Sequence, residues 1–172
     1  MNKNKKNFLF YGHQTLDKKD YKWVEKALKS DWLTTGPFVE KFEKELTKIT
    51  QAKYAVVCSS GTSALILAYM SLFGINSKKK ALIPSMTFIG TANAAKLLGM
   101  EVDFVDCYPE NGLIDLNHLE KKIRNGNYDL IVPVHMNGQP AEMVKIFKIA
   151  KKYNLNVIDD ASHAIGSSYR SK

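Results

Sequence analysis

The fold is decided by the stretch Val157-Ile158-Asp159-Asp160-Ala161-Ser162-His163-Ala164, which lies close to the end of the 172-residue chain. An apolar run over residues 155–158, with one Asn inside it, ends abruptly in two carboxylates, and a segment of small residues with a histidine follows. In an open α/β sheet, a strand delivers a charged side chain in this way to the crevice at its carboxyl end, where such folds bind ligands. A strand followed by a solvated acidic turn has the same pattern, so this stretch alone leaves both interpretations open.

Upstream of this stretch, short apolar runs alternate with segments of helical periodicity. Strands are predicted over residues 54–58, 81–83, 102–105, 130–134 and 155–158. Helices are predicted after Asp17, Pro37, Asp115 and Pro140, over residues 64–73, and through Ala92, Ala95 and Leu98. The helix over residues 64–73 is apolar on every face except at Ser71, which predicts that it is buried. Such an alternation predicts an α/β fold, with three α-β-α layers around a mostly parallel sheet.

The composition excludes several classes of function. Hydrophobic residues make up 45% of the chain and charged residues 24%, as in an ordinary globular protein. The net charge of +8 comes from lysines scattered over segments such as 3–6, 78–80 and 151–152, without an RNP-like aromatic pattern, a helix-turn-helix or a zinc finger, so no nucleic-acid partner is expected. The two cysteines form no CxxC pair, and no metal site is expected. The apolar run over residues 8–11 is too short for a signal-peptide core or a membrane span, so a cytoplasmic protein with no membrane partner is expected.

After the first predicted strand, Ser60-Gly61-Thr62-Ser63 opens a helix. Unpaired backbone N–H groups and the helix dipole bind anions at such a position, and Gly61 allows an anion to approach the backbone closely. A Ser or Thr N-cap explains the same four residues without any ligand. The chain contains no GxxxxGK[ST], and no GxGxxG follows this strand, so neither a P-loop nucleotide site nor a standard dinucleotide site is expected.

Other predicted strand ends carry an aromatic residue and a carboxylate. Phe88 follows the second predicted strand, and Asp160 follows the last, with His163 three residues further on. Together with the anion site, this set matches the needs of pyridoxal phosphate (PLP): donors for the phosphate, a stacking partner for the ring, and a buried carboxylate that keeps the ring nitrogen protonated. His135, after the fourth predicted strand, is expected to be a hydrogen-bonded structural residue.

The chain resembles the DegT-type sugar aminotransferases, which are PLP enzymes of the aspartate-aminotransferase fold (fold type I). The resemblance is carried, in the family's order, by residues 33–37, 60–65, 84–88 with 91–94, 134–135 with 138–140, and 158–164 with Gly166. It implies that residues 1–35 form an N-terminal arm and first helix. It also implies that residues 36–172 form the N-terminal part of a large PLP-binding domain, and that the rest of this domain and a small domain lie outside the chain.

The resemblance further implies roles for single residues. The phosphate-binding turn corresponds to Gly61, Thr62 and Ser63, the residue stacked on the cofactor ring to Phe88, the partner of the pyridine nitrogen to Asp160, and a residue near the cofactor's phenolic oxygen to His163. Departures from the residues frequent in the family occur at Asp159, Ser162 and Asn137. The lysine that forms the Schiff base in this family is expected beyond Lys172, so no catalytic residue is assigned within the chain.

The implied activity is that of a PLP-dependent aminotransferase for a nucleotide-linked 4-keto-6-deoxy sugar in cell-surface glycan biosynthesis, with glutamate as the amino donor. Enzymes that form UDP-4-amino-4,6-dideoxy sugars are the nearest family members, and perosamine-type GDP-sugar enzymes come second. The full-length enzyme is implied to be a homodimer. Two alternatives stay open: a catalytically inactive fragment or non-catalytic domain that binds PLP or a partner, and a Rossmann-type nucleotide module, which the missing glycine fingerprint disfavours.

Overall fold

Four parallel strands form the sheet at the centre of the computed structural model, in the order β2-β1-β3-β4. The strands are β1 (Lys80–Pro84), β2 (Glu101–Val105), β3 (Leu130–Ile131) and β4 (Asn156–Val157). Ala81 of β1 pairs with Val102 of β2 on one side and with Leu130 of β3 on the other. Beyond the short strands β3 and β4, a further parallel bridge joins Val134 to Asp160. The prediction of a parallel sheet is confirmed.

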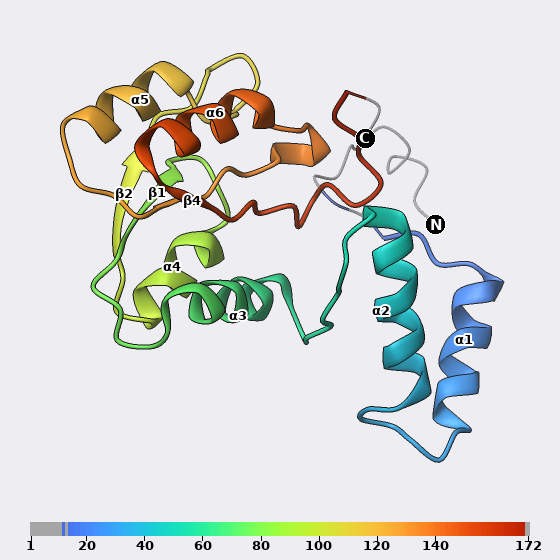
Figure 1. Ribbon diagram of the computed structural model, residues 1–172. Helices are drawn as coiled ribbons and strands as arrows, with labels where there is room; N and C mark the ends of the chain where they lie inside the picture. Colours follow the sequence, from blue (N-terminus) through green and yellow to red (C-terminus); the bar gives the residue numbers. More distant parts are fainter. Residues whose placement is uncertain (1–11, 13, 171–172) are drawn as a thin grey trace, which may run out of the picture.

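Helices cover both faces of this sheet and give the molecule three layers (Figure 1). The helical elements are α1 (Lys18–Leu28), α2 (Pro37–Thr50), α3 (Gly61–Phe73), α4 (Ile89–Leu97), α5 (Leu116–Arg124), the short 3-10 helix η2 (Met136–Gly138) and α6 (Met143–Tyr153). Helices α3 and α4 lie on one face of the sheet, and α5 and α6 lie on the other (Figure 1). The predicted α-β-α arrangement is therefore confirmed.

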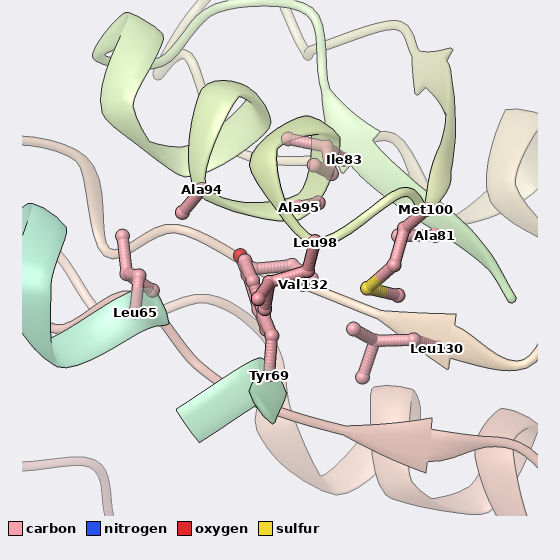
Figure 2. Packing of buried hydrophobic residues seen from close by; sticks show 10 residues of the cluster. All are labelled: Leu65, Tyr69, Ala81, Ile83, Ala94, Ala95, Leu98, Met100, Leu130 and Val132. Carbon is pink, nitrogen blue, oxygen red and sulfur yellow. The ribbon is translucent and has the colours of Figure 1, made fainter. Parts of the chain in front are cut away.

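A separate hydrophobic core fills each face of the sheet. Successive side chains of a strand point to opposite faces, and β1 follows this rule. Ala81 and Ile83 belong to the core with α3 and α4, whereas Leu82 belongs to the core with α5 and α6. Figure 2 shows the first core, in which Tyr69 of α3 lies among aliphatic side chains from α4 and the strands. From Ala81 to Pro84 the strand β1 is buried on both faces, and these four residues are all apolar, as expected for a strand covered on both sides.

Helices α1 and α2 lie beside one another, away from the three layers (Figure 1). Asp17 accepts hydrogen bonds from the first turn of α1, and Pro37 occupies the first turn of α2, as predicted. The ring of Trp23 packs edge-on against that of Phe38, with 6.2 Å between the ring centroids. The predicted division of the chain between residues 35 and 36 stays a prediction.

The strand predicted over residues 54–58 is not formed, so that prediction is wrong. The side chains of Tyr54 and Val56 are each 76% exposed. Apolar and β-branched residues form a strand only where a neighbouring strand completes the ladder, and no described residue pairs with this segment as a strand. Instead, the Val57 N–H donates to the Glu43 carboxylate at 2.9 Å. The described part of the chain thus has four strands rather than five.

The helix predicted over residues 64–73 is α3, and Gly74 ends it as expected. Leu65 and Tyr69 are buried, but Leu67, Met70 and Leu72 are exposed, because no described element covers that side of the helix. The prediction of burial on every face is therefore wrong. Some boundaries also differ: β3 ends at Ile131 rather than near residue 134, β4 spans Asn156–Val157 rather than 155–158, and α6 begins at Met143, three residues after Pro140.

The structure describes residue 12 and residues 14–170. The basic segment 1–6, the apolar run 8–11 and Lys172 lie outside the described residues. Within the described residues, no helix has the length and apolar character that a membrane crossing requires.

Candidate cofactor site

A cavity of about 1120 Å³ opens at the sheet edge where the carboxyl ends of the parallel strands meet. Its walls come from the N-terminus of α3 and from the segments that follow all four strands. The lining residues are Ser60, Gly61, Thr62, Leu65, Met86, Thr87, Phe88, Pro109, Glu110, Asn111, Gly112, Val134, Met136, Asn137, Gln139, Asp160, Ser162 and His163. Five of the six predicted site residues therefore share one cavity: Gly61, Thr62, Phe88, Asp160 and His163.

The N-terminus of α3 presents backbone donors to this cavity. The Ser60 hydroxyl caps the helix and accepts the Ser63 N–H at 3.1 Å. No described residue accepts a hydrogen bond from the N–H groups of Gly61 or Thr62, which belong to the unpaired first turn. These donors and the helix dipole suit an anion such as a phosphate group.

Ser63, the sixth predicted residue, does not line the cavity. Its hydroxyl lies 3.0 Å from the Ser60 hydroxyl and 3.3 Å from that of Ser59. Its side chain and N–H therefore take part in capping the helix, as the ligand-free interpretation of this segment required. Its predicted contact with a phosphate group stays a prediction.

Two glycines allow the site elements to approach one another. A Cβ atom on Gly61 would lie 3.0 Å from the Ser162 hydroxyl oxygen, which is tighter than most such contacts. A Cβ atom on Gly90 would lie 2.6 Å from the Thr62 hydroxyl oxygen and 2.9 Å from the ring of Phe88. The glycines therefore let α3 pack closely against the first turn of α4 and the loop after β4.

Phe88 occupies the N-cap position of α4, and 67% of the residue is exposed. It has no ring partner among the described aromatic side chains. Its backbone is fixed, because the Thr91 N–H donates to the Phe88 carbonyl at 3.1 Å. An aromatic face that is open to a cavity and held on a helix cap suits the stacking of a flat ligand.

Asp160 is a buried carboxylate at the edge of the cavity, only 6% exposed. Its Oδ2 accepts the Thr91 hydroxyl proton at 2.7 Å, and its Oδ1 accepts both the hydroxyl at 2.6 Å and the N–H at 3.2 Å of Ser162. Its backbone is held by hydrogen bonds to the backbone of Pro133 and His135. A buried carboxylate that accepts these three hydrogen bonds has a fixed orientation.

Asp159 has a different environment from Asp160. It does not line the cavity, and its Oδ2 lies 3.3 Å from Nε2 of His135. His135 is buried, and its Nδ1 accepts the Ala141 N–H at 3.2 Å, so Nε2 carries the proton that Asp159 accepts. This hydrogen bond holds the pKa of Asp159 below its ordinary value, although desolvation acts in the opposite direction. His135 is thus the hydrogen-bonded structural residue that its position predicted.

Sequence reasoning missed several residues of the site. Thr91 and Ser162 bind the Asp160 carboxylate, and the turn over residues 109–112 forms a wall of the cavity. Thr91 follows Phe88 by three residues, and this spacing could have indicated that Thr91 lies near Phe88, but not that it contacts Asp160. For the turn over residues 109–112, the Asn111-Gly112 pair is typical of a turn, but it does not indicate that the turn lines a cavity.

Two curated proteins are similar in sequence to most of this chain. A UDP-4-amino-4,6-dideoxy-N-acetyl-beta-L-altrosamine transaminase from Campylobacter jejuni subsp. jejuni serotype O:23/36 is 43% identical over 164 residues, which are 94% of this chain and 43% of that protein. A GDP-perosamine synthase from Escherichia coli O157:H7 is 35% identical over 159 residues, which are 92% of this chain and 43% of that protein. The chain thus spans less than half the length of these curated relatives.

Solved structures share the fold. PseC of Helicobacter pylori, an aminotransferase involved in the biosynthesis of pseudoaminic acid, matches with a TM-score of 0.87 and 32% identity over 95% of this chain and 44% of its own. A GDP-4-keto-6-deoxymannose-3-dehydratase with a trapped PLP-glutamate geminal diamine matches with a TM-score of 0.85 and 27% identity over 93% of this chain and 42% of its own. The fold is that of the fold type I PLP-dependent sugar aminotransferases. The family model for the DegT/DnrJ/EryC1/StrS aminotransferases matches residues 14–172, and the chain belongs to this family.

Proposed function

We propose that this chain binds PLP and forms part of an aminotransferase that acts on a UDP-linked 4-keto-6-deoxy sugar. The observation that carries the proposal is the convergence of three chemically different groups on one cavity: the donors at Gly61 and Thr62, the open ring of Phe88 and the buried carboxylate of Asp160. These groups fit the phosphate, the ring and the ring nitrogen of PLP in turn. The cavity volume of about 1120 Å³ also leaves room for a substrate beside a cofactor.

When bound, PLP supplies an electron sink that stabilises negative charge on the carbon next to the transferred nitrogen. The residues of the chain have complementary tasks. Asp160 would accept a hydrogen bond from the protonated ring nitrogen, and Phe88 would cover one face of the ring. The first turn of α3 would hold the phosphate, and His163 would lie near the phenolic oxygen, as the family resemblance implies.

The covalent step requires a lysine that the cavity does not provide, because no described residue that lines it is a lysine. We assign this role to a lysine outside residues 1–172. The same full-length protein is proposed to act as a cytoplasmic homodimer, where Cys58 and Cys107 stay reduced as free thiols.

The choice of substrate rests on the relatives. The UDP-sugar transaminase at 43% identity favours a UDP-linked sugar over the GDP-linked sugar of the perosamine synthase at 35% identity. Glutamate is the proposed amino donor, since the related dehydratase structure holds a PLP-glutamate adduct. The product would enter a cell-surface glycan.

An amination assay with the full-length protein tests this proposal. The protein is incubated with PLP, L-glutamate and either a UDP-linked or a GDP-linked 4-keto-6-deoxy sugar, and the sugar product and 2-oxoglutarate are quantified by mass spectrometry. We expect amination of the UDP-linked sugar, with one 2-oxoglutarate formed per amino sugar. Turnover of the GDP-linked sugar alone would favour the perosamine-type activity. PLP binding without turnover of either sugar would favour the non-catalytic alternative.

A further inference from the structure

Thr91 stands out among the buried polar residues, because it contacts the proposed cofactor partner without lining the cavity. It is fully buried in α4, and its hydroxyl donates to Oδ2 of Asp160 at 2.7 Å. We propose that Thr91 is a positioning residue, which orients the Asp160 carboxylate toward the ring nitrogen of PLP. The inference rests on the proposed function, since it takes Asp160 as the partner of that nitrogen.

The hydrogen bonds on Asp160 indicate which oxygen would meet the cofactor. A carboxylate oxygen accepts about two hydrogen bonds. Ser162 donates two to Oδ1, through its hydroxyl and its N–H, so Oδ1 is filled. Oδ2 accepts from Thr91 and is the oxygen that can receive a further proton donor from the cavity. Thr91 therefore holds the oxygen that the ring nitrogen would contact.

The hydrogen bonds that join Thr87, Thr91 and Asp160 can have only one donor-to-acceptor order. The hydroxyl oxygens of Thr87 and Thr91 lie 2.9 Å apart, and either could donate to the other. A threonine hydroxyl has one proton, and that of Thr91 is directed to the Asp160 carboxylate. Thr87 must then donate to Thr91, so a chain of two hydroxyl groups stabilises the negative charge of Asp160.

The same helical turn also carries the proposed stacking residue. The Thr91 N–H donates to the carbonyl of Phe88, and the Tyr69 hydroxyl donates to the carbonyl of Thr91 at 3.1 Å. Burial, assisted by the nearby negative charge of Asp160, raises the pKa of Tyr69, so its hydroxyl remains a donor at physiological pH. The first turn of α4 is thus fixed to the core, and it sets the positions of the ring partner and of the nitrogen partner together.

A hydroxyl-specific set of variants tests the inference in the full-length protein. Thr91→Val keeps the shape of the side chain but removes its donor, whereas Thr91→Ser keeps the donor. For each variant we would measure the dissociation constant of PLP, the induced circular dichroism of bound PLP, and kcat and KM for glutamate. Tyr69→Phe is the matched control, because it removes a buried hydroxyl that contacts Thr91 but not the Asp160 carboxylate.

Loss of a hydrogen bond to a charged group should weaken PLP binding about tenfold to a hundredfold in Thr91→Val. We expect its induced circular dichroism to fall and kcat to decrease while KM for glutamate stays within about twofold, and we expect Thr91→Ser to restore all three. Tyr69→Phe should lower the unfolding temperature and weaken PLP binding much less than Thr91→Val does, because the Thr91 hydroxyl keeps its hydrogen bond to Asp160. If Thr91→Val does not fold, Thr91→Ala and Thr91→Ser form a second pair that differs only in the hydroxyl group.

Three results would overturn the inference: wild-type PLP binding and kcat in Thr91→Val, equal impairment in Thr91→Ser, or the same cofactor effects in Tyr69→Phe. The last two would mean that Thr91 acts through packing alone. Failure of the wild-type protein to take up PLP is a different result, because it would refute the proposed function and the inference with it.

Discussion

Asp159 and Asp160 are neighbours in the sequence, but among the described residues their side chains share no hydrogen-bond partner. Asp159 pairs with His135, whereas Asp160 accepts from Thr91 and Ser162 and lines the cavity. One carboxylate therefore ties the loop after β4 to the loop after β3, and the other faces the candidate cofactor site. Because the two carboxylates have different partners, we expect substitution of Asp160 to affect the cofactor site and substitution of Asp159 to leave that site largely unchanged.

Asp160→Asn should lower the turnover of the full-length protein by at least about a hundredfold, because a neutral amide no longer stabilises a protonated ring nitrogen. Asp159→Asn is the matched control, since it makes the same chemical change one residue away. Its turnover should stay within about threefold of wild type. Steady-state kinetics at a fixed PLP excess measures both. Near-normal turnover in Asp160→Asn would remove the role assigned to this residue.

Replacement of Phe88 should separate stacking from other contributions to binding. Phe88→Leu keeps an apolar side chain but removes the aromatic face, and we expect PLP to bind roughly tenfold more weakly. Phe88→Tyr keeps the ring and should bind PLP nearly as wild type does. Fluorescence titration with PLP measures both dissociation constants. Equal affinities for the two variants would show that the ring does not stack on the cofactor.

Gly90→Ala should disturb the site through two neighbours at once. The new Cβ would press on the Thr62 hydroxyl and the Phe88 ring, so both must move from their positions in the cavity wall. We expect PLP affinity to fall by about tenfold, even though alanine is the better helix former by about 1 kcal/mol. Asn93→Ala, at an exposed position of α4, controls for helix propensity. Unchanged affinity in Gly90→Ala would mean that the site adapts to the added methyl group.

The stability of the fold should depend on pH through Asp103, which is remote from the cavity lining. Hydrogen bonds from Lys122 and Tyr128 lower the pKa of Asp103 from 3.8 to about 2. A carboxyl group with a lowered pKa stabilises the folded state at pH values above its ordinary pKa of 3.8. This contribution is lost as the pH falls from 3.8 toward 2. Because the side chain is 31% exposed, we expect Asp103→Asn to lower the free energy of unfolding at pH 7 by only about 1 kcal/mol.

Urea unfolding of both proteins between pH 7 and pH 2 measures this difference, which should shrink below pH 3.8. Glu120→Gln is the control, since the pKa of Glu120 is also lowered to about 2, but through the exposed side chains of Lys152 and Arg124. Salt at about 0.5 M should remove most of the Glu120 effect and less of the Asp103 effect. A difference for Asp103→Asn that stays constant down to pH 2 would contradict the assignment.

The parts of the fold that local patterns determine could be predicted from the sequence. Asp17 and Asp115 cap their helices, Gly74 ends α3, and β1 with its neighbours forms a parallel sheet, as expected. The segment over residues 54–58 could not be predicted, because strand formation depends on a partner strand that no local pattern reveals. Burial of a helix face likewise depends on a neighbouring element, so the apolar sequence of α3 predicted burial on a side that is in fact exposed.

For the site as well, local sequence patterns predicted some residues but not the contacts between distant elements. Phe88 and Asp160 were recognisable because each follows a predicted strand, and such positions share one sheet edge. Thr91 was not recognisable as a partner of Asp160, since 69 residues separate the two and only the packing of α4 against the sheet joins them. Contacts between elements distant in the sequence depend on side-chain geometry, which periodicity does not encode.

The central claim is that Gly61 with Thr62, Phe88 and Asp160 surround one PLP molecule. A crystal structure of the full-length protein grown with PLP tests this claim most directly. We predict the phosphate at the N–H groups of Gly61 and Thr62, the ring against Phe88, and the ring nitrogen within hydrogen-bond distance of Asp160 Oδ2. PLP bound away from this cavity, or with its ring nitrogen directed away from Asp160, would contradict the account.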